Sequence, residues 1–132
     1  MTSLEEIMDR LTPRPAEEKA GLTVNNTRRK IGTLDPQGRK VRIEQFLFDA
    51  NAVTTKMTVE LEIQLPNGTT KPLAGYTTDI LVDTVGDAID GAPLITEYPI
   101  DVYLTNADNE NVAWWSSLTW IPMDDSPPSS LW

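Results

Sequence analysis

Paired carboxylates are the residues of this sequence that most directly suggest catalysis. Glu60 and Glu62 alternate with apolar residues, and Asp79 and Asp83 lie four positions apart. Two carboxyl groups suffice for glycoside hydrolysis, in which one is the acid and the other the base or nucleophile. Acidic side chains on the polar face of an amphipathic strand are, however, ordinary surface residues. We expect Glu60 and Glu62 to have this second role.

Other catalytic and ligand-binding signals are weak. The 132 residues include no histidine and no cysteine, which excludes disulfides, thiol nucleophiles, zinc–thiolate sites and Ser–His pairs. The segment Asp108-Asn109-Glu110-Asn111 offers oxygen ligands, but its spacing does not match a calcium loop and suits a hairpin turn. The seven glycines are scattered, so no phosphate-binding loop is present. We expect no catalytic residue, metal or cofactor.

The tryptophans suggest contacts rather than chemistry. Trp114 and Trp115 are neighbours, and adjacent residues of a strand point to opposite faces. Either both pack in a buried strand, or one is an association residue or a platform for a sugar ring. Trp132 follows a tail rich in serine and proline, so it should dock in a groove on this or another subunit, and we predict that it docks on a neighbouring subunit or scaffold. We predict Trp114, Trp115 and Trp132 as interface residues.

Charge is divided unevenly along the chain. All eleven lysines and arginines lie between Arg10 and Lys71, whereas residues 72–132 carry ten acidic side chains and no basic one. Either the two sets pair within one fold, or the basic patch of one copy meets the acidic surface of the next, in which case salt weakens association. The overall pI near 4.3 disfavours nucleic acid as a partner. The predicted basic patch comprises Arg28, Arg29, Lys30, Arg39, Lys40 and Arg42.

Residues 3–11 are predicted to form a short helical arm. Ser3 and Glu6 have the spacing of a capping box, and Pro13 ends the helix. Such a short helix is marginal in water, so its apolar stripe requires a surface on its own domain or on a neighbour. The predicted stripe, also an interface, is Leu4, Ile7, Met8 and Leu11. The expected organisation is an arm with a proline linker (1–15), a β-domain (16–123) and an extended tail (124–132).

The β-domain is predicted from alternating apolar residues and turn signals. Segments 28–34 and 39–48 flank Asp35-Pro36-Gln37-Gly38, which fits a type I turn and predicts a hairpin. Segment 55–65 alternates strictly and ends at Asn67-Gly68, which predicts a second hairpin. Its return strand starts near Thr70 and contains Pro72 and Gly75, which favour a sheet edge.

The remaining segments complete the predicted fold. A strand through residue 82 is followed by an irregular or briefly helical stretch, and segments 99–106 and 112–123 form a last hairpin whose first arm buries Ile100, Val102 and Leu104. The count is six to eight short strands. This pattern is typical of a mainly β chain that forms an antiparallel sandwich or barrel.

These features favour a non-enzymatic structural protein that assembles with copies of itself or with a larger scaffold. Small β-domains with exchanging arms are common in viral and phage particles, as capsid, decoration or tail parts. The alternatives are a small acidic inhibitor that docks on a basic partner, and a carbohydrate-binding β-sandwich. No apolar run could span a membrane and the first residues do not resemble a signal peptide. We therefore expect synthesis inside a cell, and a place there or in a virion.

Overall fold

The computed structural model describes residues 15–22, 27–49, 56–81, 84–89, 93–106 and 113–132. The predicted helix at 3–11, with its four apolar interface residues, lies outside this part of the chain, as does the segment 107–112. Within the described ranges the chain forms strands and no helix, and therefore no helix able to cross a membrane. The strands are β1 (Glu17–Leu22), β2 (Arg28–Leu34), β3 (Val41–Asp49), β4 (Lys56–Gln64), β5 (Thr70–Leu81), β6 (Val85–Asp87), β7 (Leu94–Thr96), β8 (Ile100–Asn106) and β9 (Ala113–Pro122).

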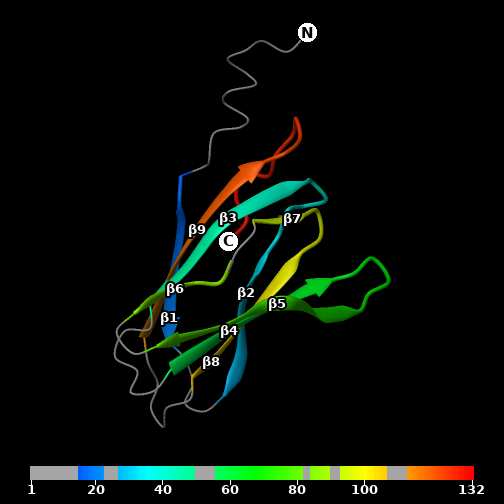
Figure 1. The fold of residues 1–132 in the computed structure, drawn as a ribbon. Coiled ribbons are helices and arrows are strands. Elements are labelled where there is room, and N and C mark those ends of the chain that lie inside the picture. The colour runs from blue at the N-terminus through cyan, green and yellow to red at the C-terminus, as the bar shows by residue number, and fades with distance from the viewer. Residues whose placement is uncertain (1–14, 23–26, 50–55, 82–83, 90–92, 107–112) are drawn as a thin grey trace.

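The strands form two antiparallel sheets, as the sequence predicted. Sheet A has the order β1-β9-β3, and the short strands β6 and β7 pair with successive parts of the far edge of β3. Sheet B has the order β2-β8-β4-β5. The two sheets pack as separate layers, so the fold is a sandwich rather than a barrel (Figure 1).

The core lies between the inner faces of the sheets. Met57, Val59 and Leu61 of β4 are fully buried or nearly so, as their alternation predicted. The predicted inner face of β8 is also confirmed, because its three apolar residues are buried. Sheet A contributes the large aromatic residues: Phe46, Phe48 and Trp120 have no exposed surface.

The predicted hairpin of β4 and β5 is confirmed. Leu65 and Thr69 close the turn with a backbone hydrogen bond of 2.8 Å, and Gly68 has the positive φ of 86° that this turn requires. β5 is the edge strand of sheet B, as expected from Pro72 and Gly75. Its pairing with β4 is interrupted opposite Leu61, where Gly75 has a φ of 84°.

Two other predicted hairpins are wrong. β2 pairs with β8 in sheet B while β3 pairs with β9 in sheet A, so neither the β2–β3 nor the β8–β9 connection is a hairpin. The tight turn after β2 is at residues 36–39, where Gln37 and Gly38 both have positive φ. A turn signal specifies a reversal of the chain, not the hydrogen-bond partner of the next strand. The six residues between Leu34 and Val41 are enough to cross the roughly 10 Å between packed sheets.

The strand β1 was not anticipated. Its sequence, Glu-Glu-Lys-Ala-Gly-Leu, contains no β-branched or aromatic residue, so no local signal favours a strand. It forms because it pairs along its whole length with β9. With β1, β6 and β7 included, the described residues contain nine strands rather than the six to eight predicted.

Candidate interaction surfaces

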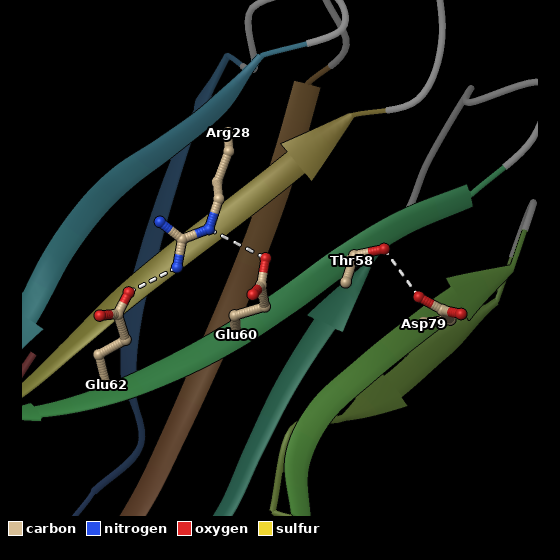
Figure 2. A network of polar contacts seen from close by, with 5 residues as sticks. All are labelled: Arg28, Thr58, Glu60, Glu62 and Asp79. Atoms are coloured by element: carbon tan, nitrogen blue, oxygen red, sulfur yellow. Dashed lines mark hydrogen bonds and ion pairs between the residues drawn. The ribbon is translucent and has the colours of Figure 1, made fainter. Parts of the chain in front are cut away.

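The outer face of sheet B is a network of charged and polar side chains. Arg28 of β2 reaches across β8 to two carboxylates of β4: its Nε lies 3.0 Å from Glu60 Oε1 and its Nη2 lies 2.5 Å from Glu62 Oε2 (Figure 2). The guanidinium carbon lies 3.8 Å from the centre of the Tyr103 ring. Partial burial disfavours the charge of Arg28, but the hydrogen bonds that it donates to Glu62 and Glu60, together with their negative charges, outweigh this and raise the pKa of Arg28. The candidate catalytic pair is thus held as the acceptors of a surface ion-pair network.

A second cluster on this face surrounds Asp79 of β5. Thr58 Oγ1 donates to Asp79 Oδ1 at 2.7 Å, and Lys56 Nζ lies 3.0 Å from Oδ2 (Figure 2 shows the Thr58 contact). The hydrogen bond from Thr58, followed by that from Lys56, lowers the pKa of Asp79. A general acid requires a raised pKa, so this carboxylate is tuned in the opposite direction.

The third cluster contains a buried carboxylate. Asp101 of β8 is only 4% exposed, and its Oδ1 accepts hydrogen bonds from Thr33 Oγ1 at 2.7 Å and Gln64 Nε2 at 2.8 Å. Lys30 Nζ lies 3.9 Å from the same oxygen. The outer face of sheet B therefore carries its own counter-charges.

The predicted basic patch is not one surface. Arg28, Arg29 and Lys30 begin β2 in sheet B, whereas Arg39, Lys40 and Arg42 lie in the β2–β3 connection and in β3 of sheet A. About 13 Å of strand, from Lys30 to Leu34, separates the first group from the β2–β3 connection, because β2 rises about 3.3 Å per residue. Lys30–Asp101 and Lys56–Asp79 pair the basic and acidic halves of the chain within one fold, while Arg42 pairs locally with Glu44. Part of the charge division in the sequence is thus neutralised in space.

The outer face of sheet A carries more apolar side chains than that of sheet B, interspersed with polar ones such as Glu18, Arg42, Asp49, Ser117 and Thr119. Trp114 is 5% exposed and belongs to the core, so its neighbour Trp115 is on the outer face, half-buried, opposite Ala20 and Asp49. Leu22 at the end of β1 is 70% exposed, Val85 56% and Ile95 48%. Cross-strand pairing places the following residues on this face: Ala20, Leu22, Leu47, Val85, Ile95, Trp115 and Ile121.

The C-terminal residues dock on their own domain. Leu131 is 4% exposed and belongs to the core, and Trp132 packs edge-on against Phe46 with ring centres 5.2 Å apart. Trp132 Nε1 donates to Ser116 Oγ at 2.8 Å, and Lys19 Nζ lies 4.3 Å from the centre of its ring. The prediction that Trp132 docks on a neighbouring subunit or scaffold is therefore wrong, because Phe46, Ser116 and Lys19 of its own chain provide its docking site.

Glu17 holds this docked tail. Its carboxylate accepts hydrogen bonds from Trp120 Nε1 at 2.5 Å, from the Leu131 backbone N–H at 3.0 Å and from the Trp132 N–H at 3.3 Å. The Leu131 carbonyl accepts from the Asp35 N–H at 3.1 Å. Sequence reasoning missed Glu17, because its role depends on three groups more than 100 residues away.

The tail fills one half of the gap between β1 and β2, the adjacent edges of the two sheets. We call this gap the seam. Its other half contains a cavity of about 260 Å³ with Trp114, Leu104 and Ile31 among its lining residues, together with Leu22 from β1. Arg29 and Lys30 also line this cavity, and Arg29 is exposed and has no ion pair with any described residue.

No other chemical site emerges in the part of the chain that the structure covers. No cluster of three or more metal-ligating side chains occurs among those residues.

Comparison with known proteins finds similarity in structure only. No protein-family model matches the sequence, and no curated protein matches it. A structure of the disulfide-linked pili of Bacillus endospore appendages is 13% identical with a TM-score of 0.49, covering 86% of this chain and 90% of that one. The Yersinia pseudotuberculosis-derived mitogen is 12% identical with a TM-score of 0.47, covering 89% and 94%. A chain in the structure of infectious bursal disease virus (Gt strain) is 11% identical with a TM-score of 0.43, and the match covers 90% of this chain and 35% of the viral chain.

Proposed function

We propose that this protein is a non-enzymatic assembly module that binds a second copy of itself through the outer face of sheet A. The observation that carries the proposal is the contrast between the two outer faces of the sandwich. Sheet B has ion pairs and polar hydrogen bonds on its outer face, whereas sheet A has the half-buried Trp115, Leu47 and Ile121, with Asp49 and Arg42 opposite two of them, on a face that no described element covers. Large exposed apolar patches on small proteins commonly mark association sites.

The size of this face suits a second copy. Strands of nine or ten residues extend about 30 Å, and four strand widths of about 4.8 Å give roughly 600 Å² per subunit. Two copies would bury about 1,200 Å², the lower end of the range for specific interfaces. In a dimer with two-fold symmetry the same surface patch lies on both subunits, so the apolar residues of one copy can contact those of the other.

The edges of sheet B disfavour the other common route to β-assembly, strand addition. β2 begins with three consecutive basic residues and its pairing is irregular after Lys30. β5 carries Pro72 and the bulge around Gly75. Charges, proline and bulges on edge strands prevent edge-to-edge pairing. Association through a sheet face is therefore favoured over lengthening of sheet B.

The sequence-based assignment to a viral or phage particle remains a prediction about where such an assembly belongs. The absence of histidine and cysteine in the full sequence supports a non-enzymatic role, because it removes the commonest general base and the thiol nucleophile.

The test is the mass of the protein in solution, measured by sedimentation equilibrium on the full chain and on variants of each face. Trp115→Lys places a cation opposite Asp49, and Ile121→Glu places an anion opposite Arg42, so both preserve cross-strand pairing. Thr77→Lys, opposite Glu60 on the outer face of sheet B, is the matched control. We expect a self-associating wild type and control, and a shift to monomer in the two face variants. A monomeric wild type, or face variants that associate like the control, would refute the proposal.

A further inference from the structure

The unfilled half of the seam offers a binding site of definite chemistry. Trp132 and Leu131 show what the seam accepts in its filled half: apolar side chains inserted between the edges of the two sheets. The cavity beside it has the same kind of lining, with Trp114, Leu104 and Ile31. At about 260 Å³ it exceeds the roughly 150 Å³ that suffices for benzene in an engineered protein cavity. It can therefore take an isoleucine, leucine or methionine side chain.

The basic residues of the cavity specify the charge of the occupant. Arg29 lies opposite Leu104 in the register of β2 and β8, an inward-facing position for a strand residue. This places its guanidinium, which no described carboxylate neutralises, at the cavity. Lys30 also lines the cavity, but it is opposite Tyr103 on the outer face of sheet B and its Nζ lies 3.9 Å from Asp101 Oδ1, so Arg29 is the basic residue that faces inward. An apolar segment that carries acidic side chains beside its apolar residues would complement this site.

One segment of this chain has that composition. The apolar stripe of residues 3–11 is interrupted by Glu5, Glu6 and Asp9. As a predicted nine-residue helix it would extend about 14 Å and present apolar and acidic residues together. Residues 3–11 also contain Arg10, so the three acidic side chains leave this segment with a net side-chain charge of −2.

We propose that residues 3–11 of one copy bind the seam cavity of a second copy, with an apolar side chain in the cavity and acidic side chains against Arg29. This inference rests on the proposed self-association and adds a second contact to it. Binding in trans is favoured because the cavity lies beside Leu22, the far end of β1 from the arm, about 16 Å from Glu17. Reaching it in cis requires a reversal within residues 12–16, where Pro13 and Pro15 favour extended backbone and no glycine is present.

The natural absence of cysteine allows a direct test by disulfide cross-linking. Full-length Thr12→Cys, which keeps the apolar stripe and the acids, is mixed with full-length Leu22→Cys under mild oxidation. The matched control replaces Leu22→Cys by Lys71→Cys on β5, at the opposite edge of sheet B. We expect several-fold more Thr12→Cys/Leu22→Cys heterodimer than control heterodimer, rising with concentration. Equal yields would overturn the proposal. A Thr12→Cys/Leu22→Cys double variant that closes only within one chain would overturn binding in trans.

Charge exchange tests the specificity of the contact. Arg29→Glu in the Leu22→Cys chain should reduce the heterodimer several-fold, whereas Arg39→Glu, in the β2–β3 connection, should leave it unchanged. Glu5→Arg with Asp9→Arg in the Thr12→Cys chain should restore cross-linking to the Arg29→Glu chain. The proposed charge complementarity is wrong if Arg29→Glu leaves the cross-linking yield unchanged, or if Glu5→Arg with Asp9→Arg does not restore it. If the wild type associates by mass but the Thr12→Cys and Leu22→Cys chains give no more cross-link than the control, the arm contact alone is overturned and the sheet A interface stands.

Discussion

At the scale of single residues, Glu17 joins the two ends of the described chain. It sits at the start of β1, half-buried, and accepts hydrogen bonds from an indole of the core and from two backbone N–H groups of the C-terminal tail. Hydrogen bonds to a charged acceptor are stronger than neutral ones. The carboxylate therefore stabilises both the position of Trp120 and the docking of Leu131 and Trp132.

Replacing this carboxylate should destabilise the fold. Glu17→Gln leaves one acceptor oxygen and turns an NH₂ group toward N–H donors, so we expect a loss of about 2 kcal/mol or more. Glu18→Gln is the matched control, since Glu18 is exposed, and should change stability by less than about 0.5 kcal/mol. Thermal unfolding followed by circular dichroism measures both. Equal melting temperatures for the two variants would show that the hydrogen bonds to Glu17 do not stabilise the docked tail.

Asp79 predicts a pH effect with a definite sign. Its pKa is lowered in the folded protein, chiefly by the hydrogen bond from Thr58, so the ionised form stabilises the fold. This stabilisation is present above the pKa of the unfolded chain and is lost as the pH falls through the lower, folded pKa. Because Asp79 and Lys56 are about half exposed, the contribution is below about 1 kcal/mol.

Thr58→Val should raise the pKa of Asp79 toward its ordinary value, because the first of its two hydrogen-bond donors is removed. Thr105→Val is the control, since Thr105 lies directly opposite Thr58 on the neighbouring strand. Carboxyl carbon shifts followed by NMR during an acid titration give the pKa in each variant. An unchanged Asp79 in Thr58→Val would mean that Lys56 alone lowers its pKa.

At the scale of elements, the docked C-terminal tail fills half of the seam between β1 and β2. Ordering a chain segment costs about 1 kcal/mol per residue or more, so burial of two side chains alone would not hold it. Backbone hydrogen bonds to Glu17 and Asp35 offset part of that cost. Docking also requires the Trp132 ring to lie close to the backbone of Gly32 in β2. A Cβ at Gly32 would lie 2.7 Å from Trp132 Cζ3 and 2.5 Å from Lys19 Nζ.

A double-mutant cycle tests this packing. Trp132→Ala should destabilise the domain by about 1.5–3 kcal/mol through lost burial. Gly32→Ala should cost about 1–3 kcal/mol in the wild type, because its methyl group displaces the indole, and much less once Trp132 is removed. The coupling between the two, from denaturant unfolding of all four chains, should exceed about 1 kcal/mol. Additive effects would place the tail away from Gly32 in solution.

At the scale of the whole molecule, the two outer faces predict how association responds to salt. The carboxylates of sheet B already have partners within the chain, and the proposed interface on sheet A carries more apolar side chains than the outer face of sheet B. Ion-pair contacts weaken in about 1 M salt, where the Debye length is about 3 Å, whereas apolar contacts do not.

We therefore expect the full chain to remain associated in about 1 M NaCl, while the yield of the Thr12→Cys/Leu22→Cys cross-link decreases because the contact of the acidic arm with Arg29 is screened. Sedimentation equilibrium across a salt series measures the first effect, and the cross-linking yield measures the second. Dissociation of the whole assembly by salt would mean that basic and acidic surfaces of neighbouring copies hold it together, which is the alternative that the charge division raised.

The sequence by itself determined the features that depend on local chemistry. Strict alternation at Met57, Val59 and Leu61 predicted a strand with one buried face, and Asn67-Gly68 predicted its turn, because side-chain period and backbone conformation are set within a few residues. The mainly β class with antiparallel sheets followed from the same patterns.

Only the tertiary structure decided which strands are partners. A turn signal reverses the chain, but whether the next strand stays in the same sheet depends on how both inner faces are buried, and this separated Arg28–Lys30 from Arg39–Arg42. β1 has no strand signal of its own and exists through its pairing with β9. The exposure of Trp115 rather than Trp114 and the docking of Trp132 on Glu17 were likewise decided by packing between residues far apart in the chain. Burial of apolar surface is a property of the whole sandwich, so no window of sequence contains it.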